Sequence, residues 1–166
     1  TPLSIESKFI QPDVWSKNLD FILNPFFSRE REDSYEVDRL GTSVTFQKEL
    51  TKKSAAYISY TFGKDKVDIS KSNDSLSIED AGKLNHNKSG VTLGYNLNTT
   101  NDIFSPEKGW KYEGTATYMG IGFNSQFHYY KIMTEIDYFH SLWKNVVFAG
   151  KIKTGIIEPT DRKSVV

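Results

Sequence analysis

The titratable residues with the most regular spacing lie in the last third of the chain. Glu135 and Asp137 are two residues apart, and Lys131 shares their parity. Side chains two apart on an extended strand point to the same side, so the two carboxylates could act as an acid–base pair. Lys151 and Lys153 have the same spacing further on. Cross-strand charge pairing in a water-filled interior accounts for all five residues without catalysis.

Other catalytic chemistries find less support. His86, His128 and His140 have no partner at the spacing of a metal site, and the chain has no cysteine. No serine lies in a Gly-x-Ser-x-Gly motif, although His128 or His140 could assist a serine as in barrel lipases. There is also no glycine-rich phosphate loop. We therefore expect a protein that is not an enzyme, with no cofactor and no metal.

The overall composition limits the classes of partner. Lys+Arg and Asp+Glu both number 21, and no basic stripe is visible. This excludes nucleic acid as the main partner, because phosphate binding needs clustered cations. The apolar runs are far shorter than the roughly 20 residues of a membrane-spanning helix. A hydrophobic content of 37% suits strands that alternate between lipid and a polar lumen. The aromatic content of 14% suits either such a barrel or a soluble sandwich.

Alternating apolar and polar residues recur along most of the chain, the pattern of half-buried strands. We predict an all-β fold, an antiparallel up-and-down meander of about eight strands, which is part of a transmembrane β-barrel or closes as one. A single β-barrel segment spans 1–166, with a long polar loop at 64–88 and a charged hairpin loop at 29–33. A short helix is expected near 77–84. The predicted strands are 2–10, 18–28, 35–50, 54–63, 89–98, 109–121, 126–139 and 145–157.

The last two predicted strands divide their side chains between two faces. Ile132, Ile136, Phe148 and Ile152 share one face, opposite the lysines and carboxylates. In a membrane barrel the first set faces lipid and the charges face the lumen. Short turns are expected at one end, at 11–17, 51–53, 99–108 and 140–144. Near that end lie aromatic residues that would form a headgroup-level belt on a barrel, or a hydrophobic rim on a soluble domain: Trp15, Trp110, Tyr138 and Trp143.

The turn that follows residue 97 is the most distinctive motif. It reads Asn98-Thr-Thr-Asn-Asp-Ile-Phe-Ser-Pro-Glu-Lys-Gly109, followed by Trp110. We expect a structural corner here and no active site. The residues predicted to shape the bend are Asn98, Asp102, Pro106 and Gly109, with Trp110 as its anchor.

This turn resembles the D-x-x-D/N-x-x-x-x-P-x-x-G pattern of bacterial surface antigen barrels, the BamA/TamA group. Tyr129-Tyr130-Lys131, the run Val146-Val-Phe-Ala-Gly-Lys-Ile-Lys153 and the opening Phe9-Ile-Gln-Pro-Asp13 are also similar to that group. The resemblance implies a sixteen-stranded barrel. We expect this chain to be an internal piece, approximately its fourth to eleventh strands.

The resemblance also implies a function and a location. Members of the group lie in the bacterial outer membrane, where a barrel with a weak seam inserts or secretes client outer-membrane proteins by edge pairing. The implied partners are outer-membrane lipid, client proteins and other assembly subunits, and a fragment could dimerise through open strand edges. The alternative is a soluble or small-barrel β module for binding or adhesion.

Overall fold

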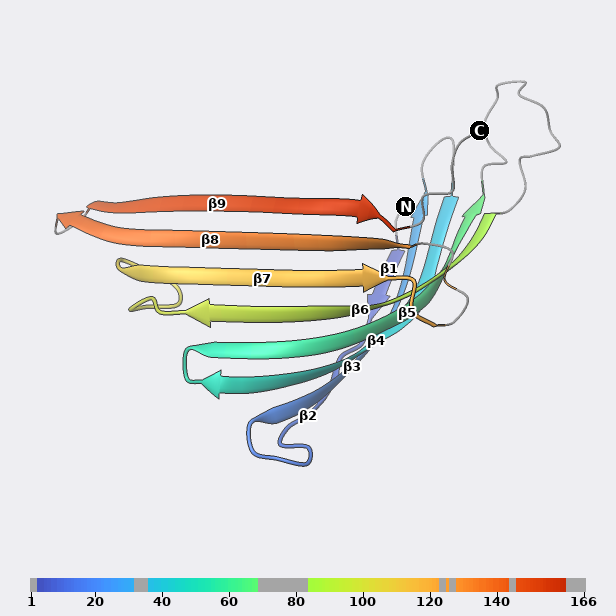
Figure 1. The fold of residues 1–166 in the computed structure, drawn as a ribbon, viewed down its shortest axis with the longest axis horizontal. Helices are drawn as coiled ribbons and strands as arrows, with labels where there is room; N and C mark the ends of the chain where they lie inside the picture. The colour runs from blue at the N-terminus through green and yellow to red at the C-terminus, as the bar shows by residue number, and fades with distance from the viewer. Residues whose placement is uncertain are drawn as a thin grey trace, which may run out of the picture.

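The computed structural model describes residues 3–31, 36–68, 84–122, 125, 128–143 and 146–160. All regular structure in these residues is β (Figure 1). The strands form one antiparallel sheet in the order β1-β3-β4-β5-β6-β7-β8-β9, and β2 also pairs with β3. The predicted up-and-down meander is therefore confirmed. The strands are β1 Leu3–Glu6, β2 Phe9–Gln11, β3 Leu19–Arg31, β4 Glu36–Thr51, β5 Ser54–Asp68, β6 Leu84–Asn98, β7 Gly109–Met119, β8 Tyr129–Trp143 and β9 Val146–Pro159.

The first predicted strand is divided in two. β1 and β2 follow one another along the same side of β3, β1 against Phe26–Arg29 and β2 against Phe21–Leu23. The break lies near Pro25, whose nitrogen has no hydrogen for the ladder. Only its carbonyl is used, as the acceptor of a 3.1 Å hydrogen bond from the Ser7 N–H. The nine strands thus occupy eight positions in the sheet.

Several strands are longer than the sequence pattern predicts. The 64–88 loop is wrong at both ends, because β5 continues to Asp68 and β6 begins at Leu84. The 29–33 loop is wrong for residues 29–31, which belong to β3, and the 140–144 turn is wrong for residues 140–143, which belong to β8. At 29–31 and 64–66 polar side chains on both faces conceal the strand, because alternation is visible only where one face is apolar. Residues 77–83 of the expected helix lie outside the described residues.

The sheet is open. No pairing joins β9 to β1 or β2 among the described strands, so β9 and the β1–β2 line are its two edges. The alternative that the chain closes by itself as a small barrel is therefore wrong. Closure requires the first and last strands to meet with a fixed stagger. Figure 1 shows the strands in one curved layer with no second layer packed on either side.

The register sorts the side chains into two faces. One row across the sheet is apolar throughout: Phe21, Phe46, Ile58, Leu93, Ala116, Ile132 and Ile156. We call this side the apolar face. The next row, on the other side, is mostly hydroxyl and charge, and we call that side the polar face: Thr45, Ser59, Thr92, Thr117 and Lys131.

This sheet has almost no enclosed core. Within the described residues the buried apolar side chains are Val37, Ala55 and Met119. Large residues of the apolar face are instead exposed, such as Leu93 at 53% and Ile132 at 48%. The described part of the chain contains no helix long and apolar enough to cross a bilayer. The apolar face therefore requires an apolar environment that the chain does not itself supply.

Candidate functional site

The carboxylates and lysines of the last two strands form one cluster on the polar face. Glu135 lies opposite Lys153, and Asp137 lies opposite Lys151. Glu135 Oε2 is 3.2 Å from Lys153 Nζ, and Glu135 Oε1 contacts Lys151 Nζ. Asp137 Oδ1 is 3.6 Å from Lys151 Nζ, too far for a hydrogen bond. The two carboxylates are neutralised by lysines, an arrangement that suits a charged, hydrated surface better than proton transfer.

Lys131 lies apart from this cluster. It is opposite Thr117 on one side and Ile157 on the other. No ion pair to it is present in the described part of the chain. The structure thus brings four of the five charged residues together and leaves Lys131 six residues from Asp137 along the same face. A third carboxylate, Glu113, lies directly opposite Glu135 and was not among the predicted residues.

The four predicted apolar residues share the apolar face. Ile136 on β8 is opposite Ile152 on β9, and Phe148 on β9 is opposite His140 on β8. Ile152 is 67% exposed and Phe148 is 53% exposed. Residues this large and this exposed on a continuous face mark a surface that contacts lipid or another protein.

Aromatic residues border the apolar face at two heights. Near the 98–110 turn, the Trp110 and Tyr138 rings lie 4.3 Å apart, and Phe148 is 6.4 Å from Tyr138. Eight residues further along these strands, Tyr118 and Tyr130 lie opposite each other. The apolar-face residues between the two aromatic rows on β7 and β8 carry no charge: Tyr112, Gly114, Ala116, Ile132, Thr134 and Ile136.

The 98–110 turn is held by side chains that accept backbone hydrogen bonds. Asn98 Oδ1 accepts from the Thr100 N–H at 3.0 Å. Asp102 Oδ1 accepts from the N–H groups of Phe104 and Ser105, at 2.7 and 2.8 Å. Both hydrogen bonds lower the pKa of the Asp102 carboxyl, and the bond from the Ser105 N–H has the larger effect.

A residue that the sequence analysis missed completes this turn. Asn101 Oδ1 accepts from the N–H groups of Glu107 and Lys108, both at 3.0 Å. Pro106 lies between the segment held by Asp102 and the segment held by Asn101, at a position where no N–H is needed. The asparagine that directly precedes Asp102 was the available signal, because Asn readily forms Asx turns.

Gly109 ends the turn with a φ of +115°, in the region that favours glycine. A Cβ at this position would lie 2.7 Å from the Thr99 carbonyl oxygen. Trp110 then closes the turn, since its N–H donates to Thr99 Oγ1 at 3.0 Å. The turn is therefore a structural corner in which Asn98, Asn101 and Asp102 accept hydrogen bonds from the backbone of the turn itself.

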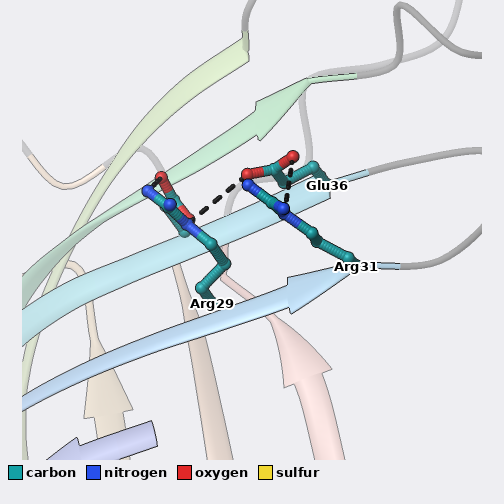
Figure 2. Close-up of polar contacts among 4 residues, drawn as sticks. Arg29, Arg31 and Glu36 are labelled. Atoms are coloured by element: carbon teal, nitrogen blue, oxygen red, sulfur yellow. Dashed lines mark hydrogen bonds and ion pairs between the residues drawn. The ribbon is translucent and has the colours of Figure 1, made fainter. Parts of the chain in front are cut away.

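A second set of ion pairs joins the end of β3 to the start of β4, at the end of the sheet away from the 98–110 turn. Figure 2 shows these contacts. Arg29 donates to both carboxylate oxygens of Asp38, at 2.6 and 2.9 Å. Glu36 bridges the two arginines, 3.4 Å from Arg29 Nε and 3.1 Å from Arg31 Nε. This cluster is not predicted from the sequence, because 29–33 was expected to be a charged hairpin loop and the structure places Arg29 and Arg31 in β3. The available signal was the spacing of opposite charges: two arginines lie two residues apart on one strand, and two carboxylates, Glu36 and Asp38, lie two residues apart on the next.

The histidines remain separate from one another. His140 stacks on Tyr138 with ring centroids 6.2 Å apart, and His128 approaches Gly120. Across the described residues no group of three or more His, Cys, Asp or Glu side chains is placed to hold a metal ion.

Known proteins share this architecture. The family model described as the Omp85 superfamily domain matches residues 2–166. A solved structure described as BamA from Haemophilus ducreyi lacking POTRA domains 1–3 superposes with a TM-score of 0.79 at 15% sequence identity. The match covers 95% of this chain and 33% of that one, so the chain spans about a third of the length of that relative. No curated protein matches the sequence.

Proposed function

Because the chain belongs to the Omp85 superfamily, we propose that it forms eight neighbouring strand positions in the wall of a larger barrel that assembles or translocates client outer-membrane proteins. The family is found in the bacterial outer membrane and consists of non-enzymatic assembly and transport factors. The observation that carries the proposal is the open sheet, with one exposed apolar face, one charged face and two unpaired edges. Such a sheet is complete only when lipid covers one face and further strands pair with both edges.

In this proposal the apolar face contacts lipid, including Ile132, Ile136, Phe148 and Ile152. The dimensions support this placement. Trp110 and Tyr118 are eight residues apart, as are Tyr138 and Tyr130, which corresponds to about 27 Å along a strand. With strands tilted by about 40°, the two aromatic rows would stand roughly 21 Å apart along the membrane normal, close to the roughly 25 Å apolar band of outer-membrane barrels.

The polar face then lines the water-filled interior. Lys131, Glu135, Asp137, Lys151 and Lys153 are its charged residues at the β8–β9 side. The ion pairs among them leave no net charge on the Glu135–Asp137–Lys151–Lys153 group, so it neither attracts nor repels a charged polypeptide strongly. We assign this group a structural role in a hydrated lumen and no catalytic role.

The two edges of the sheet are where we expect contacts with other strands. The unpaired edge of β9 and the interrupted edge of β1 and β2 would pair with the next strands of the full barrel. An isolated piece would satisfy the same groups by dimerising. The client-templating seam would lie outside these strands, and the 98–110 turn would form a rigid hairpin on one side of the membrane. The exposed apolar face argues against the alternative of a soluble binding module.

The proposal is tested with the full-length protein that carries this sequence, reconstituted in liposomes. An unfolded client barrel is added, and its folding is followed by its heat-modifiable migration on gels. We expect faster client folding than in protein-free liposomes, and slower folding when Gly109 is replaced by Ala. Gly150→Ala is the matched control, because the nearest atoms to its Cβ would be 3.4 and 3.6 Å away. Equal client folding with and without the protein would overturn the proposal.

A further inference from the structure

A groove on the apolar face lies beyond the second aromatic row, at the end of the sheet that holds the arginine ion pairs. It has a volume of about 450 Å³. Leu40 on its wall is 61% exposed and lies directly opposite Lys64 on the neighbouring strand. A volume in the range of roughly 300–1,000 Å³ is typical of ligand sites. The residues that line the groove are Leu40, Gly41, Thr42, Phe62, Gly63, Lys64 and Asn87.

Position along the strand gives the depth of this groove. Tyr60 lies in the same row as Tyr118 and Tyr130, and Lys64 is four residues further along β5. Four residues correspond to about 13 Å along a strand. Phe62 thus lies close to the aromatic row, and Lys64 lies further out, at the height of lipid headgroups.

The apolar face carries an excess of cations at this end. Four cationic side chains share the parity of Phe27 and Leu40: Arg29, Arg31, Lys64 and Lys66. Three carboxylate residues share that parity, Glu36, Asp38 and Asp68, so the cations exceed the carboxylates by one. Both oxygens of Asp38 are already occupied by Arg29. Lys64 and Lys66 make no ion pair within the described part of the chain.

The polar face at the same height is balanced. Arg39 pairs with Glu30 at 2.9 Å, and Lys88 pairs with Asp65 at 2.8 Å. Two cations there meet two carboxylates. The excess positive charge is therefore confined to the face that carries the groove, where a ligand with an apolar part and an anionic part would complement both features.

We propose that this groove binds an anionic phospholipid, with an acyl chain along Leu40 and Phe62 and the phosphate against Lys64 and Lys66. This inference rests on the proposed function, which places the apolar face in a bilayer. Juxtamembrane cations attract anionic lipids by about 1 kcal/mol each. Arg29 and Arg31 stay engaged with their carboxylates and contribute the rigid, positively charged border of the site.

The test uses the full-length protein that carries this sequence, purified in an uncharged detergent and titrated with phosphatidylglycerol or phosphatidylcholine. Bound lipid is counted by native mass spectrometry. We expect a preference for phosphatidylglycerol, and an affinity for it about thirtyfold lower in the double variant Lys64→Gln, Lys66→Gln. Phosphatidylcholine binding should not change in that variant. Leu40→Ser should weaken the binding of both lipids.

The matched control is the double variant Lys52→Gln, Lys53→Gln, which removes the same charge from the β4–β5 turn at the other end of the sheet. It should retain the preference. The inference is overturned if Lys64→Gln, Lys66→Gln keeps the full preference, if the control loses it equally, or if both lipids bind alike. Heat-modifiable migration of each variant reports separately on whether the barrel itself forms, which tests the proposed function.

Discussion

The Tyr57 ring lies flat across Gly94, its cross-strand partner on the polar face. The ring carbon Cζ would be 2.1 Å from a Cβ at position 94. No side chain can therefore be added at residue 94 unless Tyr57 moves. Tyr57 is half-buried, and its ring occupies the space that a side chain at residue 94 would fill.

Gly94→Ala should displace Tyr57 and destabilise the barrel by about 1–3 kcal/mol, the usual cost of overpacking. The measurement is the urea midpoint of unfolding of the full-length protein in detergent micelles. Gly150→Ala serves as the control, since its Cβ would meet only ordinary contacts at 3.4 and 3.6 Å. Equal midpoints for the two variants would show that the Tyr57 ring has room to move.

Ile132→Arg and Met133→Arg should differ strongly, although the residues are adjacent. Ile132 belongs to the apolar face, where an arginine near the middle of the bilayer costs about 2–4 kcal/mol. Met133 faces the other way and shares a small cavity with Glu113 and Glu135, which would pair with the new charge. The free energy of unfolding in lipid vesicles compares the two variants. A larger loss for Met133→Arg would reverse the assignment of the faces.

Trp110 should lie at headgroup depth. The double variant Trp15→Phe, Trp143→Phe keeps Trp110. In this variant we expect the fluorescence of Trp110 to be quenched more strongly by lipids brominated near the headgroup than by lipids brominated near the chain end. A companion variant with Phe at all three tryptophan positions and Phe104→Trp is the control. Phe104 is 97% exposed in the turn, so this tryptophan should be quenched little by either lipid. Strongest quenching of Trp110 from the chain end would contradict the placement.

Asp102 should make the stability of the 98–110 turn depend on pH. Its pKa is lowered in the folded protein by the Ser105 and Phe104 N–H groups, so its contribution is present above the pKa of the unfolded chain. That contribution is lost as the pH falls through the lower folded value. The stability advantage of the natural chain over Asp102→Asn, measured by urea unfolding, should therefore shrink on acidification below the ordinary aspartate range. An advantage that is constant with pH would count against the role of the carboxylate.

Gly109→Ala should cost about 1–3 kcal/mol, because alanine at a φ of +115° is strained and its Cβ would meet the Thr99 carbonyl. Pro106→Ala should cost less, since no hydrogen bond depends on residue 106. Both are measured as urea unfolding midpoints in micelles. A greater loss for Pro106→Ala would show that the proline ring, and not the glycine conformation, sets the corner.

Alternation with a period of two was visible in the sequence wherever one face is apolar. It predicted the meander, the separation of Ile132 and Ile136 from Glu135 and Asp137, and the turn that ends at Gly109. The alternation did not predict strand where both faces are mostly polar, as at Lys64–Asp68 and Arg29–Arg31. In such segments apolar and polar residues do not alternate, so a strand cannot be recognised from hydrophobicity. The break between β1 and β2 was also missed, since it depends on where Pro25 falls in the register of the neighbouring strand.

The sequence by itself determined the kind of surface each strand presents, because the side-chain period of a strand is a local property of the backbone. Only the tertiary structure decided which residues meet across strands. The Lys151 bridge between Glu135 and Asp137, the Tyr57–Gly94 contact and the excess of cations beside the Leu40 groove all depend on register. Register is a relationship between segments distant in the chain, and a shift of one residue would move every side chain to the other face.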